Sequence, residues 1–199
     1  MIDNIFGQQI HFFDIESFDE IQNELIKYCY QIKKNDPSGV DRSNAGGWQS
    51  APTFPRNEIL FSTIQKSVID YFVDNKILIE GTMVSIINMW ININQKGTYN
   101  HTHSHPRCDI SGVLWIKIPE NSGVLKFENG CGFAQDNLIS CYSEHVKKAF
   151  KIYSTYKMNT KPGRVCLFPA DLRHCVEQNM NRQDRISVSF NIRVKNPER

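Results

Sequence analysis

Apolar and polar side chains alternate along two long stretches in the second half of the chain. The first covers residues 83–94, with apolar positions Ile87, Met89, Ile91 and Ile93. The second covers residues 185–194, with apolar positions Ile186, Val188, Phe190 and Ile192. A period of two with many β-branched residues is typical of a strand that has one face in the core. The opposite faces of both predicted strands are polar, and they carry Asn92, Arg185 and Ser187.

Four shorter strands complete the predicted sheet structure. They are residues 5–15, which we expect at a sheet edge, and residues 111–119, 123–129 and 164–168. A turn signal from Glu120 to Gly123 joins the second and third of them, and Pro169 ends the fourth. After Pro169 we expect a loop that leads to His174.

Two stretches have the 3.6-residue period of amphipathic helices. In residues 17–34, Ser17 and Glu20 have the spacing of a capping box. The apolar stripe of this helix is Phe18, Ile21, Leu25, Tyr28 and Cys29. In residues 57–75 the stripe is Leu60, Ile64, Val68, Ile69 and Phe72. We expect both stripes to pack in the core, so that the helices brace a sheet from outside.

The length of 199 residues predicts one globular domain. We expect residues 1–80 to form a helical and loop-rich N-terminal support, and residues 81–195 to form a β core with an insertion at 130–160. The fold class is therefore mainly β with N-terminal helices. The insertion is long, polar and rich in tyrosine, and such segments beside a site often act as lids. We expect it to select the substrate.

Charge and cysteine content narrow the classes of function. A formal net charge of +2, without a basic stripe or zinc-finger spacing, argues against nucleic-acid binding. No stretch is apolar enough to span a bilayer or to serve as a signal peptide. The six cysteines include no CxxC pair, which predicts a reduced, cytoplasmic setting, and the host cytoplasm for a viral protein.

Three histidines follow the first alternating strand. They lie at every second position in GTYNHTHSHPRCD, residues 97–109. If the chain is still extended there, His101, His103 and His105 project from one face. Two neighbouring imidazoles on one face can bind a metal, although a short HxH pattern also occurs in solvated loops.

A fourth histidine and an arginine follow in GRVCLFPADLRHCVEQNMNRQDRIS, residues 163–187. The loop after Pro169 delivers His174, and Arg185 begins the second alternating strand eleven residues later. Since Arg185 lies opposite the aliphatic face, we expect its guanidinium to bind an anion. Non-haem Fe(II) that activates oxygen is held by three protein ligands with open positions. His103, His105 and His174 can supply such a set, and Arg185 can hold the far end of a dicarboxylate such as 2-oxoglutarate.

These motifs resemble the 2-oxoglutarate and Fe(II)-dependent oxygenase superfamily, and in particular a small, prolyl-hydroxylase-like branch found in viruses and bacteria. The resemblance rests on the order of HxH, a lone histidine and RxS, together with RSNAGGWQS at 42–50 and DISGVLWIKIPENSGVLKFEN at 109–129. It implies a double-stranded β-helix (jelly roll) with two bracing α-helices. It also implies that His103, His105 and His174 bind the metal, and that Arg185 and the Ser187 hydroxyl bind the C5 carboxylate of 2-oxoglutarate.

Further residues and cofactors follow from the resemblance. Trp115 is a candidate indole donor to the same carboxylate, with a place in the core as the alternative, and Asn92 is a weaker candidate for the pocket. In the loop predicted at 36–55, Trp48 and Gln49 either overhang the site, or Trp48 plugs the end of the barrel. The implied cofactors are Fe(II), 2-oxoglutarate and O₂, with ascorbate as a stimulant. The implied reaction is hydroxylation of an unidentified substrate, either a peptidyl residue such as proline or a small metabolite.

The ligand set departs from the superfamily at one position. Most members have HxD where this chain has His105, although the small branch also tends to read HxH. Asp109 or a water molecule is an alternative for completing the metal sphere, and a shifted register would pair His101 with His103. We prefer His103 with His105, because their distance from Gly97 and the adjacent proline match the family.

A cupin-like metalloenzyme that does not use 2-oxoglutarate is the main alternative. The residues that fit the two cupin motifs are Gly97, His103, His105, Gly163, Pro169 and His174. Cupins build the same jelly-roll fold, so only the function differs. Arg185 and Ser187 favour the oxygenase, because a cupin has no general need for an arginine on this strand. A metal-free binding module with the same fold is the third interpretation.

Overall fold

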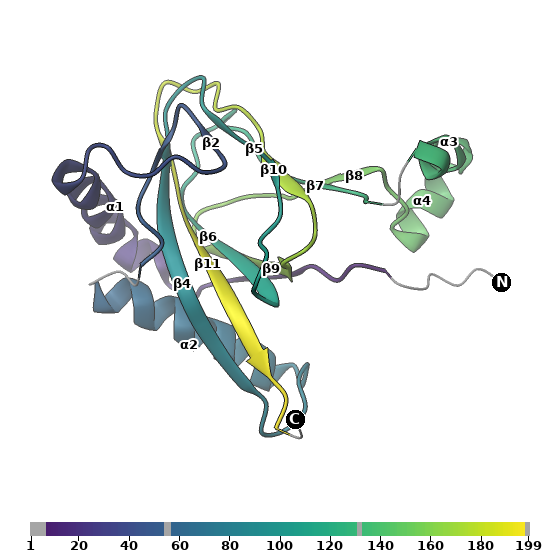
Figure 1. Cartoon of the computed structure of the whole chain (residues 1–199), viewed down its shortest axis with the longest axis horizontal. Coiled ribbons are helices and arrows are strands. Elements are labelled where there is room, and N and C mark those ends of the chain that lie inside the picture. The colour runs from purple at the N-terminus through teal and green to yellow at the C-terminus, as the bar shows by residue number, and fades with distance from the viewer. Residues whose placement is uncertain (1–6, 54–56, 131–132, 198–199) are drawn as a thin grey trace.

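Two antiparallel sheets form the body of the molecule in the computed structural model, which describes residues 7–53, 57–130 and 133–197 (Figure 1). The six-stranded sheet has the order β1 (His11–Asp14), β9 (Arg164–Pro169), β6 (Ile110–Lys117), β11 (Arg185–Lys195), β4 (Met83–Asn94) and β3 (Trp48–Gln49). The five-stranded sheet has the order β2 (Asn44–Ala45), β5 (Tyr99–His103), β10 (His174–Val176), β7 (Leu125–Glu128) and β8 (Thr155–Lys157). From β4 to β7, and again from β9 to β11, successive strands alternate between the two sheets. This is the strand order of a double-stranded β-helix, so the predicted jelly roll is confirmed.

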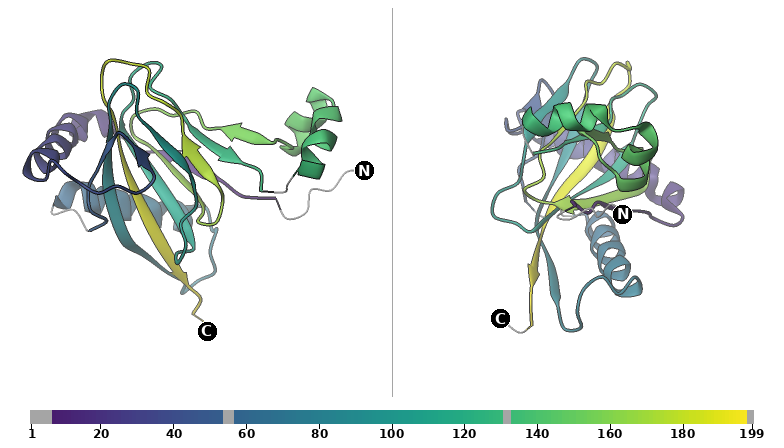
Figure 2. Two further views of the ribbon diagram at one scale, coloured as in Figure 1. Left: turned by 45° about the horizontal axis from the view of Figure 1, so that its top comes forward. Right: turned by 90° about the vertical axis from the view of Figure 1, so that its right-hand side faces the viewer.

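Two helices, α1 (Phe18–Asn35) and α2 (Glu58–Asp74), pack on the outer face of the six-stranded sheet (Figure 2). Apart from the half-buried Ile69, the residues of their apolar stripes belong to the same hydrophobic core as the aliphatic faces of β4 and β11. Leu25 of α1 and Leu60 of α2 are completely buried there. The prediction that two helices brace a sheet from outside is confirmed.

The two helices begin differently. Asn57 caps α2, because its side-chain oxygen accepts a hydrogen bond from the Leu60 N–H at 2.8 Å. The capping box predicted for α1 is wrong. Ser17 has a left-handed backbone conformation (φ 50°), and its hydroxyl makes no capping hydrogen bond. Its carbonyl instead accepts a hydrogen bond from the Glu20 N–H at 3.1 Å. The acidic side chains of the first turn also interact favourably with the positive end of the helix dipole.

The two alternating stretches form the neighbouring strands β4 and β11, and only Ile87 departs from the predicted period. Asn191 of β11 pairs with Asn88, whereas the next residue, Ile192, pairs with Ile86. Ile87 is therefore the extra residue of a β-bulge. Ile86 packs against the core in the place that the period predicted for Ile87.

The shorter predicted strands are present in the structure, which differs from the prediction at three places. Only residues 11–14 of the stretch predicted at 5–15 form β1, at the predicted sheet edge, and residues 5–6 lie outside the described part of the chain. The loop expected after Pro169 covers residues 170–173 and leads to His174, which begins β10, a short strand that the sequence analysis did not predict. The loop predicted at 36–55 contains the short edge strands β2 and β3, and its residues 54–55 lie outside the described part.

Trp48 of β3 belongs to the main hydrophobic core. It is 5% exposed, and its indole N–H donates to the Asp36 carbonyl at 2.9 Å. Neither Trp48 nor Gln49 lines the cavity that contains the four residues of the predicted metal and anion site. Trp48 therefore packs in the core between the six-stranded sheet and the helices, and the structure places it neither over the site nor at the end of the barrel.

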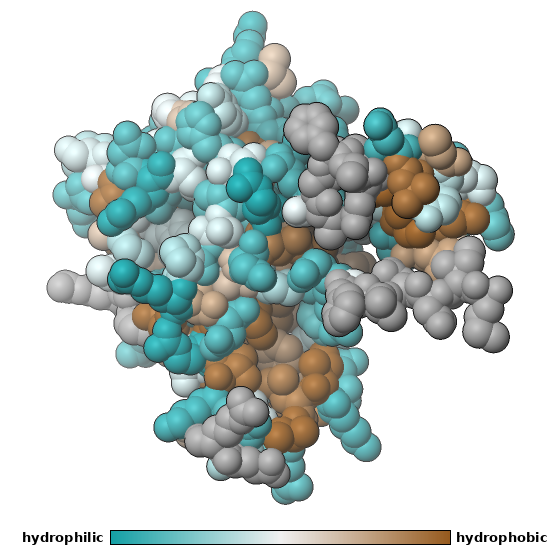
Figure 3. Space-filling model, turned by 45° about the vertical axis from the view of Figure 1, so that its right-hand side comes forward, coloured by the Kyte–Doolittle hydropathy of each residue, from teal (hydrophilic) through white to brown (hydrophobic). Residues whose placement is uncertain are grey.

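The insertion at 130–160 projects from the body of the molecule (Figures 1 and 2). It contains α3 (Phe133–Cys141) and α4 (Glu144–Phe150), and it returns through β8, which pairs with β7. Apolar residues gather on the surface of this projection (Figure 3), and Leu138 of α3 is 55% exposed. No helix within the described ranges is long and apolar enough to cross a bilayer.

Candidate metal centre and co-substrate pocket

Three histidines converge between the two sheets. His103 is the last residue of β5, His105 follows two residues later, and His174 begins β10, where it pairs with His103. One nitrogen from each ring lies within 4.8 Å of the others. The ring centroids of His103 and His174 are 4.3 Å apart, and His105 lies 5.0 Å from each. This spacing suits three ligands on one face of a metal ion.

A second β-bulge explains why His101 does not join them. Val176 of β10 pairs with Asn100, and His174 pairs with His103, so three steps along β5 match two steps along β10. The extra residue reverses the face of the strand before His103. His101 is exposed instead, with its ring 5.0 Å from that of Tyr99. The expectation that His101, His103 and His105 share one face is therefore wrong for His101.

Hydrogen bonds fix the tautomers of all three rings. The Nδ1 atom of His103 lies 2.7 Å from the His101 carbonyl, and the Nδ1 atom of His174 lies 2.8 Å from the Leu172 carbonyl. The Nδ1 atom of His105 lies 2.8 Å from the Asn191 Oδ1. An oxygen that only accepts requires Nδ1 to carry the proton, which leaves each Nε2 lone pair free for a metal.

Burial keeps these imidazoles neutral. It lowers the pKa of His103 and His105, and it lowers the pKa of His174 to about 3, with a smaller contribution from the neighbouring His103. A metal binds the neutral form of imidazole, so protons compete only weakly with a metal for these nitrogens.

Asp109 is not part of this cluster. Its carboxylate accepts a hydrogen bond from the Val194 N–H at 2.8 Å, on β11. No carboxylate of the described residues lies with the three histidines in a metal-binding group. The alternative in which Asp109 completes the metal sphere therefore has no support in the structure.

Arg185 lines the same cavity as the three histidines and is 2% exposed. Its Nη1 donates to the carbonyls of Ser122 and Glu177, the latter at 3.0 Å. Its Nη2 is buried and has no hydrogen-bond partner in the structure. Burial lowers the pKa of Arg185 to about 10, so the guanidinium stays charged at neutral pH. A buried cationic donor without a partner is costly, and an anionic ligand would satisfy it.

Other polar residues of β4 and β11 line the cavity beside Arg185. Asn94, its direct partner across the two strands, has a buried Nδ2 without a partner. Asn92 donates from Nδ2 to the Ser189 hydroxyl at 3.1 Å, while its Oδ1 is buried without a partner. Ser187 lies on the same wall. Asn94 is absent from the sequence-based candidates, although it shares the polar face of Asn92.

The position of Trp115 is compatible with both interpretations offered for it, and its role as an indole donor stays a prediction. It lines the cavity, and it also belongs to a small hydrophobic core with Leu125, Phe127 and Phe168. Trp90 also belongs to the site, because its ring lies 5.4 Å from that of His105. The sequence analysis did not name it, nor did it name Asn191, the partner of His105.

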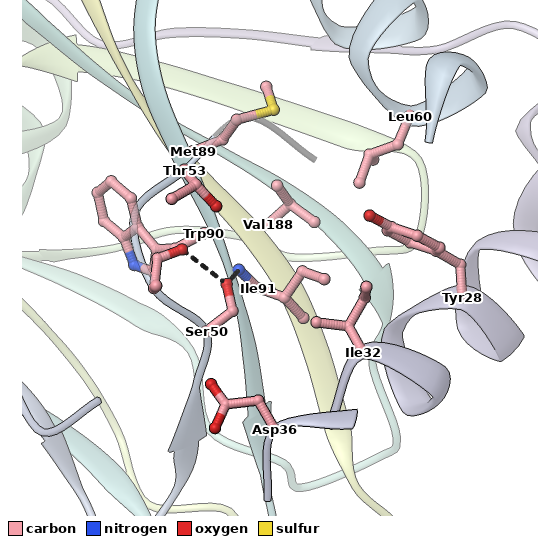
Figure 4. A pocket seen from close by; sticks show the side chains of 11 residues that line it. Tyr28, Ile32, Asp36, Ser50, Thr53, Leu60, Met89, Trp90, Ile91 and Val188 are labelled. Carbon is pink, nitrogen blue, oxygen red and sulfur yellow. Dashed lines mark hydrogen bonds between the residues drawn. The ribbon is translucent and has the colours of Figure 1, made fainter. Parts of the chain in front are cut away.

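A second cavity, of about 230 Å³, lies on the other side of β4 and β11, beneath the helices (Figure 4). Tyr28 of α1 and Leu60 of α2 face Ile91 and Val188 across it. The Ser50 hydroxyl there accepts a hydrogen bond from the Ile91 N–H at 3.0 Å. No histidine lines this cavity, which separates it from the metal centre.

The sequence profile of the family described as "Putative 2OG-Fe(II) oxygenase" matches residues 88–191, more than half of the chain. The chain belongs to this family. It is therefore a 2-oxoglutarate-dependent oxygenase that uses Fe(II), and the cupin interpretation is not supported. No curated protein matches the sequence.

Solved structures agree on the fold of this oxygenase. The viral collagen prolyl hydroxylase of Paramecium Bursaria Chlorella virus-1, in complex with 2OG, is 14% identical (TM-score 0.60), with 94% of this chain and 96% of that chain covered. A prolyl-4-hydroxylase of Pseudomonas putida is 12% identical (TM-score 0.62; 96% and 95% covered). HygX of Streptomyces hygroscopicus, with nickel and 2-oxoglutarate bound, is 9% identical (TM-score 0.61; 93% and 82% covered).

Proposed function

We propose that this oxygenase binds Fe(II) through the Nε2 atoms of His103, His105 and His174, and binds the C5 carboxylate of 2-oxoglutarate through Arg185. One observation carries this proposal: the buried, unpartnered Nη2 of Arg185 lines the same cavity as three imidazoles whose Nε2 atoms are free. A cation at one end and a metal at the other suit a dicarboxylate with a 2-keto group.

Neighbouring polar groups complete the proposed carboxylate site. The Asn94 Nδ2 and the Ser187 hydroxyl lie on the wall that carries Arg185, and each can donate to a carboxylate oxygen. Trp115 can add its indole N–H, and Asn92 lines the space between this end and the histidines. These donors replace the water that an anion loses on burial.

The bound iron and 2-oxoglutarate supply an oxidation in which 2-oxoglutarate and O₂ become succinate and CO₂ while the substrate is hydroxylated. The chain contributes position and exclusion of water. His103, His105 and His174 offer three neutral nitrogens, and the aromatic rings of Trp90 and Phe168 cover the histidines from two sides.

For the substrate, we propose a peptidyl residue such as proline. The likeness in fold to two prolyl hydroxylases supports this class. A small molecule is the second candidate, because HygX has a similar fold and was solved with hygromycin B bound. We also propose that the projection formed by α3 and α4 contacts the substrate.

Turnover of 2-oxoglutarate tests the reaction. Purified protein with Fe(II), ascorbate and O₂ should release succinate slowly without substrate. His174→Ala and Arg185→Ala should each abolish this release. Iron bound at one equivalent, with no succinate and no 2-oxoglutarate binding, would contradict the proposal.

A further inference from the structure

The three candidate metal ligands differ in what holds their rings. The Nδ1 partners of His103 and His174 are backbone carbonyls, of His101 and Leu172. The Nδ1 partner of His105 is a side chain, Asn191 Oδ1, at 2.8 Å. His105 is therefore the one ring of the three whose tautomer depends on the identity of another side chain.

The position of His105 in the chain makes this dependence stronger. It lies beyond the end of β5, where no strand ladder fixes it, and its backbone N–H donates to the Ala170 carbonyl at 2.7 Å. Its ring lies between those of His103, at 5.0 Å, and Trp90, at 5.4 Å. Ring contacts of this kind hold the plane of an imidazole but do not choose which nitrogen carries the proton.

The amide of Asn191 is itself oriented. Its Nδ2 donates to the Asn88 Oδ1 at 3.0 Å, and its Oδ1 also accepts from the Ser111 hydroxyl at 3.1 Å. Ser111 is completely buried on β6. The two partners turn the Asn191 oxygen toward His105. The opposite orientation would present an N–H to Nδ1 and would move the imidazole proton to Nε2, where it would block a metal.

The fold places this amide through the β4–β11 pairing. Asn191 and Asn88 are the last pair on the polar face before the β-bulge at Ile87. Beyond the bulge, the residues of β4 that pair with β11 are in a shifted register. The bulge therefore lies directly beside the residue pair that orients His105, as bulges near functional sites often do.

We propose that Asn191 is a positioning residue of the metal centre. It fixes the Nδ1–H tautomer of His105 and so directs the Nε2 lone pair at the metal. This inference rests on the proposed function, because it assigns a role to Asn191 only if His105 is a ligand.

The test compares two substitutions of Asn191 in the metal-free protein. Asn191→Asp keeps an acceptor oxygen, whereas Asn191→Leu has a similar volume and no acceptor. Long-range ¹H–¹⁵N NMR spectra of the histidine side chains should show His105 with its proton on Nδ1 in the native protein and in Asn191→Asp. In Asn191→Leu the proton should move partly or wholly to Nε2, while His103 and His174 keep theirs on Nδ1.

Co(II) titration gives the second readout. Loss of an outer partner typically costs 10- to 100-fold in metal affinity, and we expect that loss in Asn191→Leu but not in Asn191→Asp. In a His105→Ala background, titrated at millimolar Co(II) because one ligand is missing, Asn191→Leu should cause no further loss. An equal loss in both backgrounds, or an unchanged His105 tautomer in Asn191→Leu, would overturn the role of Asn191. A native protein that binds no Co(II) would instead contradict the proposed metal centre.

Discussion

Arg185 and Asn94 face each other across β11 and β4, and each has one buried side-chain nitrogen without a hydrogen-bond partner. Two orphaned donors on residues that line one cavity suit a ligand with at least two acceptor oxygens. A carboxylate has that geometry. The pair therefore leads to separate predictions for its charged and its neutral member.

Arg185→Ala should weaken 2-oxoglutarate binding by about 2 to 5 kcal/mol, because it leaves a desolvated carboxylate without its cation. Calorimetric titration of the Co(II)-loaded protein with 2-oxoglutarate, without O₂, measures this. Arg164→Ala is the matched control, since Arg164 pairs with Asp14 at the sheet edge and does not line the cavity. Unchanged affinity in Arg185→Ala would remove the basis of the carboxylate site.

Asn94→Ala should cost less, about 1.5 to 3 kcal/mol of 2-oxoglutarate binding, because it removes one neutral donor to a charged acceptor. Co(II) affinity should stay the same, since the structure records no contact between Asn94 and the three histidines. Asn35→Ala, at the exposed end of α1, serves as the control. A variant that loses Co(II) and 2-oxoglutarate together would indicate a structural role for Asn94.

His101 and His103 form a matched pair for the metal centre. His103→Ala should abolish Co(II) binding at micromolar concentrations, because it removes one of the three proposed ligands. His101→Ala should leave it intact, since the bulge in β5 turns His101 to the surface. If both variants lose the metal equally, the ligand register is wrong.

Much of this site follows from residue types and spacing. His103, His105, His174 and Arg185 were predicted from the sequence, and the structure brings them to one cavity. The β-bulge at Ile87 of β4 and the one in β5 were not predictable, because a bulge depends on the pairing with another strand and not on the local period. The same limit applies to Asn191, whose role depends on a partner 86 residues away in the chain.

The stability of the metal-free protein should fall as the pH falls below neutrality. The folded state keeps His174 neutral down to its pKa of about 3, whereas an unfolded histidine takes up a proton near pH 6.5. The unfolded state therefore binds more protons between these values, so lowering the pH through that window favours unfolding. The lowered pKa values of His103 and His105 act in the same direction.

Urea unfolding at pH 7 and at pH 4.5 checks this, with His174→Ala and His101→Ala beside the native protein. His174→Ala should lose less stability between the two pH values than the native protein does. The exposed His101 should make no such difference. Identical pH dependence in all three proteins would show that burial of His174 does not oppose its protonation.

The projection at 130–160 should be removable without loss of the metal or co-substrate site. Asn129 N–H donates to the Ser154 carbonyl at 2.9 Å, and Asn129 Nδ2 donates to the Tyr153 carbonyl at 3.0 Å, so a short loop can join the ends of β7 and β8. Among the residues of α3 and α4 whose side chains the structure describes, none lines the cavity. We therefore expect a variant with a four-residue glycine-rich link in place of 131–152 to bind Co(II) and 2-oxoglutarate as the native protein does.

Limited proteolysis separates a substrate-binding role from a passive one. Cleavage within α3 and α4 of the native protein should be slowed by a peptide substrate, and 2-oxoglutarate alone should have no effect, because the projection lies apart from its proposed site. Loss of 2-oxoglutarate binding in the shortened variant would show that the projection supports the cavity. Equal cleavage with and without a substrate that is turned over would show that the projection does not bind it.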